Sequence, residues 1–80
     1  VTLVFAGLKQ RVREVAERLA QGPTFGYAMT KKALLVSGTN DLATQLDLER
    51  DLMSACGRSE DYREGVQAFL EKRQPRFRGR

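Results

Sequence analysis

Apolar residues recur every three or four positions along most of the chain, which is the spacing of an α-helix with one apolar face. The clearest stripe predicts a helix over residues 8–21, and its members are Leu8, Val12, Val15, Ala16 and Leu19. Gly22 and Pro23 should end that helix, because proline cannot continue the backbone ladder and glycine readily follows a helix. Pro23 also suits the first position of a second helix.

Three further helices follow from the same pattern, and their expected spans are 24–36, 40–56 and 60–73. Gly26 lowers the helix propensity of the first of these by about 1 kcal/mol. Thr39 or Asn40 should cap the start of the helix at 40–56, and Ser59 should cap the start of the helix at 60–73. The sequence therefore predicts an all-α unit with about four helices.

The helix expected at residues 40–56 has apolar residues on two sides. One side holds Leu42, Leu46, Met53 and Cys56, and the other holds Leu48, Leu52 and Ala55. A helix that is apolar on two faces is covered twice, once by its own core and once by something else. In a chain of 80 residues, that second cover should be another subunit or another domain.

The two ends of the chain differ from this helical segment, which we place at residues 8–73. The β-branched and aromatic content of residues 1–7 predicts a short extended lead-in, which Gly7 should end. Residues 74–80 form a basic tail, in which Arg76 to Arg80 should be extended or disordered. We call these last seven residues the C-terminal tail.

The net charge of +4 is concentrated at the C-terminal end of the chain. Residues 72–80 contain no acidic side chain and five basic ones, which are Lys72, Arg73, Arg76, Arg78 and Arg80. A cationic end attracts nucleic acid, an acidic surface or a phosphorylated small molecule. A solvated tail that aids solubility has the same composition, and charge alone leaves both interpretations open.

The chain has few residues that could carry chemistry. It has no histidine and one cysteine, which excludes Ser-His-Asp and Cys-His catalysis, a zinc finger and a disulfide within the chain. Glycine-rich phosphate loops are missing, and no apolar run approaches the roughly 18 residues of a membrane span. Two acidic pairs, Glu49 with Asp51 and Glu60 with Glu64, indicate solvated surface charge rather than catalysis. Nothing argues against a reducing, cytoplasmic setting.

Phe69 and Lys72 stand three positions apart on one face of the last expected helix. They can present an aromatic ring and an ammonium group to the same ligand, and a phosphorylated purine nucleotide suits that pair. A core aromatic residue beside a solvated lysine has the same spacing and is more common. The spacing therefore does not decide between the two.

Two runs of the sequence resemble the C-terminal helical region of the crotonase superfamily of enoyl-CoA hydratases and isomerases. The first run is LAQGPTFGYAMTKKAL at residues 19–34, and the second is SEDYREGVQAFLEKRQPRFRGR at residues 59–80. The second resembles the family's closing pattern of Arg-Glu-Gly, Ala-Phe and Glu-Lys-Arg followed by proline and phenylalanine. The resemblance covers about residues 8–80. Residues 57–63 most resemble the branch of ring-opened or epoxide acyl-CoA isomerases in phenylacetate degradation.

This resemblance implies a role for three residues. In the family, the residues at the positions of Phe69 and Lys72 lie near the adenine and 3′-phosphate of coenzyme A bound to a neighbouring subunit. A residue sixteen positions before that aromatic also lies near the ligand, and here it is Met53. The resemblance thus implies a coenzyme A thioester as the substrate of a parent enzyme, with no tightly bound cofactor.

The resemblance also implies that this segment works within a larger assembly. Family members form trimers that pair into hexamers, and their helical segments make the subunit contacts. Their oxyanion hole and catalytic acids lie in an N-terminal domain, outside the run that these 80 residues resemble. We therefore expect subunit contacts and part of a coenzyme A pocket from this segment, without activity of its own.

Two other functions are weighed against this one. A stand-alone helical module could bind a protein partner, or a second copy, through its exposed apolar helix faces. A nucleic-acid binder would use the basic tail, but only Phe77 accompanies these arginines and the other helices are nearly neutral. We therefore expect an acyl-CoA partner and self-association, with no nucleic acid and no membrane.

Overall fold

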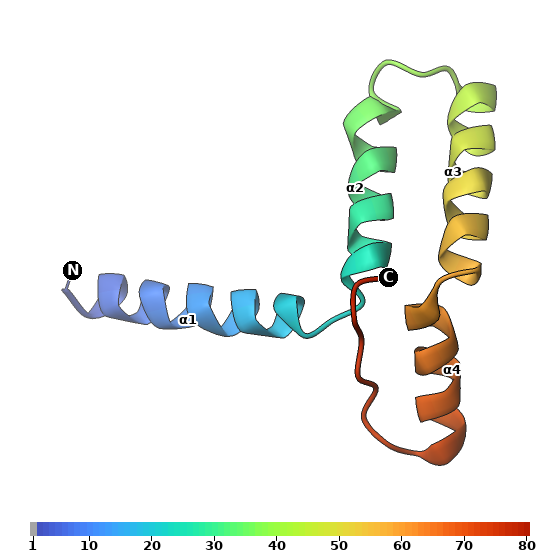
Figure 1. Ribbon diagram of the computed structural model, residues 1–80. Helices are drawn as coiled ribbons and strands as arrows, with labels where there is room; N and C mark the ends of the chain where they lie inside the picture. The colour runs from blue at the N-terminus through green and yellow to red at the C-terminus, as the bar shows by residue number, and fades with distance from the viewer. Residues whose placement is uncertain (1) are drawn as a thin grey trace.

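A computed structural model describes the backbone of residues 2–80 and the side chains of residues 7–80. All regular secondary structure in that part of the chain is α-helical (Figure 1). The helices are α1 (Thr2–Ala20), α2 (Thr24–Ser37), α3 (Leu42–Gly57) and α4 (Glu60–Glu71). The predicted all-α class with about four helices is confirmed.

The prediction of an extended start is wrong for residues 2–7, which form the first turns of α1, while Val1 lies outside the described residues. Two features of the sequence explain the helix. Phe5 stands three positions before Leu8, so the apolar spacing of the first stripe continues upstream. Gly7 costs a helix only about 1 kcal/mol relative to alanine, which is too little to end it.

Side-chain caps fix where two of the other helices begin. Ser59 caps α4 as predicted, because its hydroxyl accepts a hydrogen bond at 3.1 Å from a backbone N–H in the first turn. The prediction of Thr39 or Asn40 as the cap of α3 is wrong, since the Asp41 carboxylate accepts from the Thr44 N–H at 2.8 Å. This hydrogen bond lowers the pKa of Asp41. The negative charge of Asp41 is also stabilised by the positive N-terminal end of the helix dipole.

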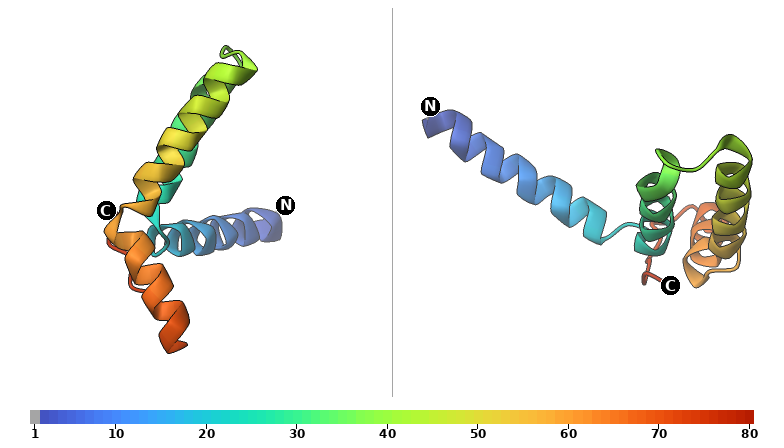
Figure 2. Two further views of the ribbon diagram at one scale, coloured as in Figure 1. Left: turned by 90° about the vertical axis from the view of Figure 1, so that its right-hand side faces the viewer. Right: turned by 90° about the horizontal axis from the view of Figure 1, so that it is seen from above.

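Helices α2 and α3 form an antiparallel hairpin that the side chain of Gln45 links (Figure 1). Its amide nitrogen donates to the carbonyl of Ala33 on α2 at 3.1 Å, and its amide oxygen accepts from Asn40 at 3.1 Å. After Gly57 the chain turns, and α4 continues away from the hairpin. α1 projects from the other side as a separate arm (Figure 2).

This arrangement is open and leaves most apolar surface uncovered. The radius of gyration is 16.6 Å, whereas a compact chain of this length has about 12 Å. The accessible surface is 6895 Å², against about 4900 Å² for a compact monomer of the same mass. Among the described side chains only Ala68 and Asp61 are buried. The stripe of α1 is exposed along its length, with Val12 at 58%.

The apolar surface of α3 is shielded on one side only. Leu48, Leu52 and Ala55 are half-buried. Leu42 and Met53 on the other side are each 75% exposed. The fold therefore supplies one of the two covers that the sequence pattern of this helix requires, and the second cover remains a prediction.

The C-terminal tail has no regular secondary structure and folds back beside α4 (Figure 1). The carboxylate of Asp61, which is 4% exposed, accepts hydrogen bonds from the N–H groups of Arg78 at 2.7 Å and Gly79 at 2.9 Å. The N–H of Asp61 in turn donates to the carbonyl of Arg80 at 2.8 Å. The tail ends against α2, because a Cβ on Gly79 would lie 2.6 Å from the Thr24 hydroxyl. One buried carboxylate thus holds the end of the chain between two helices.

We predict that Asp61→Ala releases the tail, because two backbone N–H groups lose their acceptor. Hydrogen exchange at Arg78 and Gly79 should accelerate about tenfold, and the free energy of unfolding should fall by about 1–3 kcal/mol. Asp51→Ala is the matched control, since Asp51 pairs only with Arg50 on the exposed surface of α3. It should change the free energy of unfolding by less than about 0.5 kcal/mol. Unchanged exchange at Arg78 and Gly79 in Asp61→Ala would contradict the anchoring role.

Candidate functional site

The predicted ligand contacts Phe69 and Lys72 lie together at the C-terminal end of α4. The side chain of Phe69 is 83% exposed. Lys72 directly follows the helix, and its N–H donates to the carbonyls of Ala68 and Phe69. The prediction that both residues share one helical face is wrong, because α4 ends at Glu71, two residues before its predicted end. Lys72 instead begins the turn that leads into the tail.

The backbone of Lys72 has the left-handed conformation, with φ 55° and ψ 44°. It is the one non-glycine residue with positive φ in the part of the chain that the structure describes. This conformation costs an L-residue about 1–2 kcal/mol, and glycine is the usual residue at this position after a helix. Contacts on both sides of Lys72 must therefore hold the turn.

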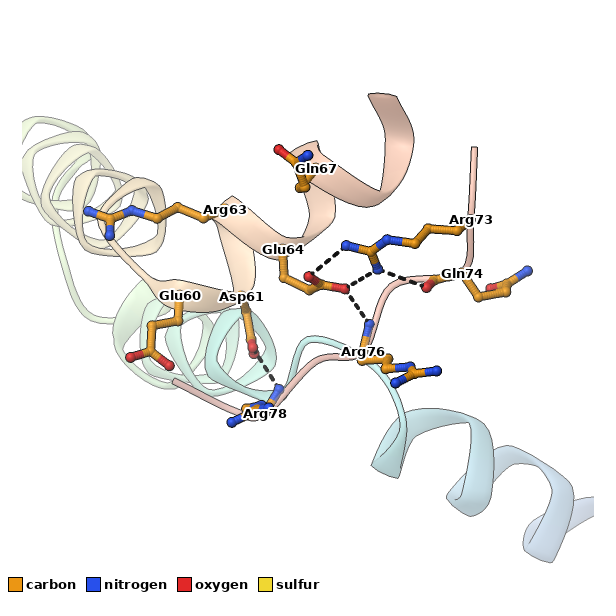
Figure 3. A pocket seen from close by; sticks show the side chains of 9 residues that line it. All are labelled: Glu60, Asp61, Arg63, Glu64, Gln67, Arg73, Gln74, Arg76 and Arg78. Carbon is orange, nitrogen blue, oxygen red and sulfur yellow. Dashed lines mark hydrogen bonds and ion pairs between the residues drawn. The ribbon is translucent and has the colours of Figure 1, made fainter. Parts of the chain in front are cut away.

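Glu64 provides the contact on the far side of Lys72 (Figure 3). Its two carboxylate oxygens accept from the guanidinium of Arg73, Oε2 from Nη1 at 2.6 Å and Oε1 from Nη2 at 3.1 Å. Oε2 also accepts from the backbone N–H of Arg76 at 2.8 Å. We call these three residues the Glu64 clamp. The N–H of Arg73 also donates to the carbonyl of Ala68 at 3.0 Å, so Arg73 is fixed by its main chain and its side chain.

The clamp changes the charges available at this end of α4. Hydrogen bonds from Arg73 and Arg76 stabilise the ionised carboxylate and lower the pKa of Glu64 from 4.5 to about 2. The same pair raises the pKa of Arg73. The charge of Arg73 is thus balanced locally. Among the described side chains, no carboxylate forms an ion pair with Lys72, whose ammonium group is left to attract an anion.

The clamp lies in an open depression of about 950 Å³ between α4 and the tail (Figure 3). Its charged lining residues are Glu60, Asp61, Arg63, Glu64, Arg73, Arg76 and Arg78. The interpretation of Glu60 and Glu64 as solvated surface charges missed their partners, because Glu60 also pairs with Arg80 at 2.8 Å. The sequence did contain a sign of these ion pairs. Acidic residues at the start of α4 are followed, within about twenty positions, by a C-terminal stretch that contains arginines and no acidic residue.

The third predicted contact, Met53, lies on α3, as the sequence pattern predicts. Its side chain is 75% exposed. Phe69 and Lys72 lie at the end of α4 and Met53 lies on a separate helix, and the ligand contacts of all three residues remain predictions. In the part of the chain with described side chains, no group of His, Cys, Asp and Glu is arranged to hold a metal ion. No described helix has the length and apolarity to cross a membrane.

The chain belongs to the enoyl-CoA hydratase/isomerase family, whose sequence model matches residues 3–80. Solved structures agree with this. The crystal structure of an enoyl-CoA hydratase from Geobacillus kaustophilus superposes with a TM-score of 0.86 and 37% identity, over 94% of this chain and 28% of that one. An enoyl-CoA hydratase from Bacillus anthracis superposes with a TM-score of 0.82 and 32% identity, over 91% of this chain and 28% of that one. The resemblance to the crotonase superfamily is confirmed.

Two curated relatives are each 52% identical to this chain. One is the 1,2-epoxyphenylacetyl-CoA isomerase of Escherichia coli, matched over 91% of this chain and 28% of the relative. The other is a probable enoyl-CoA hydratase of Rhodobacter capsulatus, matched over 85% of this chain and 26% of the relative. The chain thus spans just over a quarter of these relatives. The epoxyphenylacetyl-CoA isomerase is the kind of enzyme that residues 57–63 resemble.

We predict that the contribution of Glu64 to stability depends on acid pH. Folding lowers the pKa of Glu64 from 4.5 to about 2, so this contribution is fully present above about pH 4.5 and is lost as the pH falls towards 2. Urea unfolding of the native chain and of Glu64→Gln across this range measures it. The difference between the two should be largest above pH 4.5 and should vanish near pH 2. A difference that stays constant across the range would show that the charge of Glu64 does not stabilise the turn.

Proposed function

We propose that this chain is the C-terminal helical segment of an acyl-CoA hydratase/isomerase, where it supplies subunit contacts and part of the coenzyme A pocket. The observation that carries the proposal is an aromatic ring, Phe69, that is 83% exposed and stands three positions before Lys72, with which no described carboxylate forms an ion pair. An exposed aromatic ring three positions from a cation suits a ligand that offers both an aromatic ring and an anion. The family match supports a coenzyme A thioester as that ligand.

The two side chains suit opposite ends of the same ligand fragment. The face or edge of Phe69 can contact a purine ring, and the ammonium of Lys72 can pair with a phosphate. Coenzyme A carries both groups at its nucleotide end. Met53, a flexible apolar side chain, would add contact area to the same ligand.

The chemistry itself belongs to the rest of the enzyme. This chain has no histidine and no paired carboxylates placed for catalysis, and Asp61 and Glu64 on α4 bind the tail. The two relatives at 52% identity carry out an isomerisation and, by its name, a hydration. We therefore assign the parent enzyme to the hydratase/isomerase class with a coenzyme A thioester as substrate. An epoxide-type acyl-CoA isomerase is favoured by the resemblance at residues 57–63, and a cytoplasmic location remains a prediction.

We predict that Phe69→Ala and Lys72→Ala weaken substrate binding in the enzyme that carries this chain and leave its chemical step intact. The KM for the acyl-CoA substrate should rise about five- to fiftyfold for each variant, with kcat within about twofold of the native value. Steady-state kinetics checks this. Leu34→Ala is a control, because Leu34 is an exposed apolar residue on α2 rather than at the end of α4. A large fall in kcat at unchanged KM would contradict the binding role.

We further propose that the exposed helix faces make contacts between copies of the chain. Apolar residues are exposed on α1 and on the outer side of α3, with Val12 at 58% and Leu46 at 56%. Two observations support this proposal. Helix α3 has apolar residues on two sides and the fold shields only one of them, and the accessible surface of the chain exceeds that of a compact monomer of the same mass. A trimer, or a hexamer of paired trimers, is the assembly that the family resemblance implies.

We predict that the 80-residue chain self-associates in a concentration-dependent manner. Light scattering should give a mass above that of one copy, and Val12→Glu should shift the equilibrium towards the monomer by about tenfold or more. Gln10→Glu adds the same charge to a polar position of α1 and should leave association nearly unchanged. A well-folded monomer at all concentrations would refute self-association. A stable oligomer without affinity for coenzyme A would instead favour a stand-alone interaction module.

A further inference from the structure

The geometry points to Glu64 as a positioning residue for Lys72. This inference rests on the proposed function, because it concerns how the turn presents the ammonium group that we assign to the ligand. Glu64 does not touch that ligand in our assignment. It acts through Arg73 and Arg76, which it holds on the tail side of Lys72.

The contacts around Lys72 fix its main chain from both directions. On the helix side, the N–H of Lys72 donates to the carbonyl of Phe69 at 3.3 Å, and the N–H of Arg73 donates to the carbonyl of Ala68 at 3.0 Å. On the tail side, the carboxylate of Glu64 holds the guanidinium of Arg73 at 2.6 and 3.1 Å. A two-pronged pair of this kind restricts direction as well as distance. The main chain at Lys72 therefore leaves the helix in one direction.

This restriction matters because the left-handed backbone conformation of Lys72 is unfavourable for a lysine. At φ 55°, a lysine without support on the tail side would relax to other backbone conformations, and the direction in which its side chain leaves the main chain would change. A ligand would then have to select the productive turn from several. The Glu64 clamp orders this turn before the ligand arrives, so less conformational entropy is lost on binding.

The clamp also prevents Arg73 from competing with Lys72. Arg73 is the next residue along the chain and carries a stronger anion-binding group. Its bidentate pair with Glu64 keeps that group on the depression between α4 and the tail, where its side chain is only 38% exposed. Phosphate recognition at the end of α4 is thereby left to Lys72.

A double-mutant cycle on the enzyme that carries this chain tests the inference. Glu64→Gln keeps the shape of the side chain and removes its charge, and we expect it to raise the KM for the acyl-CoA substrate about three- to tenfold at unchanged kcat. In the Lys72→Ala background the same change should raise KM by less than about twofold. With a 3′-dephospho-CoA thioester, Glu64→Gln should have almost no effect.

Glu60→Gln is the matched control, since it removes the same charge from the same helix and breaks the pair with Arg80 instead. It should leave the KM unchanged. Arg73→Lys keeps the positive charge and cannot form the two-pronged pair, so it should raise the KM in the same direction as Glu64→Gln. Circular dichroism confirms that the variants keep their helices.

The outcomes separate this inference from the proposed function. If Lys72→Ala leaves the KM unchanged, the role of Lys72 in the proposed function fails and the inference fails with it. If Lys72→Ala raises the KM but Glu64→Gln does not, only the inference fails. An effect of Glu64→Gln that is fully additive with Lys72→Ala also overturns it, because Glu64 would then act independently of Lys72.

Discussion

Carboxylates on one short helix hold the C-terminal part of this chain in place. Asp61 and Glu64 lie on successive turns of α4, and each accepts hydrogen bonds from backbone N–H groups of the tail. Only two described side chains are buried, so apolar packing within the chain, such as that of Phe77 near Gly65, supplies only part of what fixes this geometry. The direction of the tail, the turn at Lys72 and the approach of the last residues to α2 all depend on these polar contacts.

The helices leave much of their apolar surface uncovered within the chain. A segment of 80 residues buries too little apolar area to offset the entropy of ordering four helices when they lie as far apart as they do here. The largest apolar surfaces left uncovered are the exposed stripe of α1 and the exposed side of α3. In our proposal the remainder of the enzyme and its neighbouring copies cover them. The fold is then stable as part of an assembly, and the same surfaces that bury its helices bring Phe69 towards a bound ligand.

Local rules in the sequence predict most of this fold and part of the site. The stripe from Leu8 to Leu19 and the Ser59 cap give α1 and α4, because period and capping act over a few residues. The start of α1 could not be separated from a strand, since a short apolar run with a glycine fits both. The choice of Asp41 over Asn40 as a cap depends on one hydrogen bond that composition does not reveal.

The parts of the site that the sequence did not predict involve contacts over nine or more residues. The family motif gave Phe69 and Lys72, but it did not show that Glu64 reaches Arg73 and Arg76 across a turn. Such pairs follow from where the tail returns, and spacing within one helix contains no information about that. Acids on α4 and arginines in the tail were visible as composition, and only the three-dimensional path of the chain joins them.

The left-handed backbone at Lys72 has a consequence for engineering this protein. A glycine there would relieve the strain, and a survey of stabilising substitutions would select it among the first. That same exchange removes the ammonium group that we assign to the ligand. In our proposal, thermal stability and ligand affinity therefore compete at a single position, and a more heat-resistant version obtained in this way would bind the ligand less well.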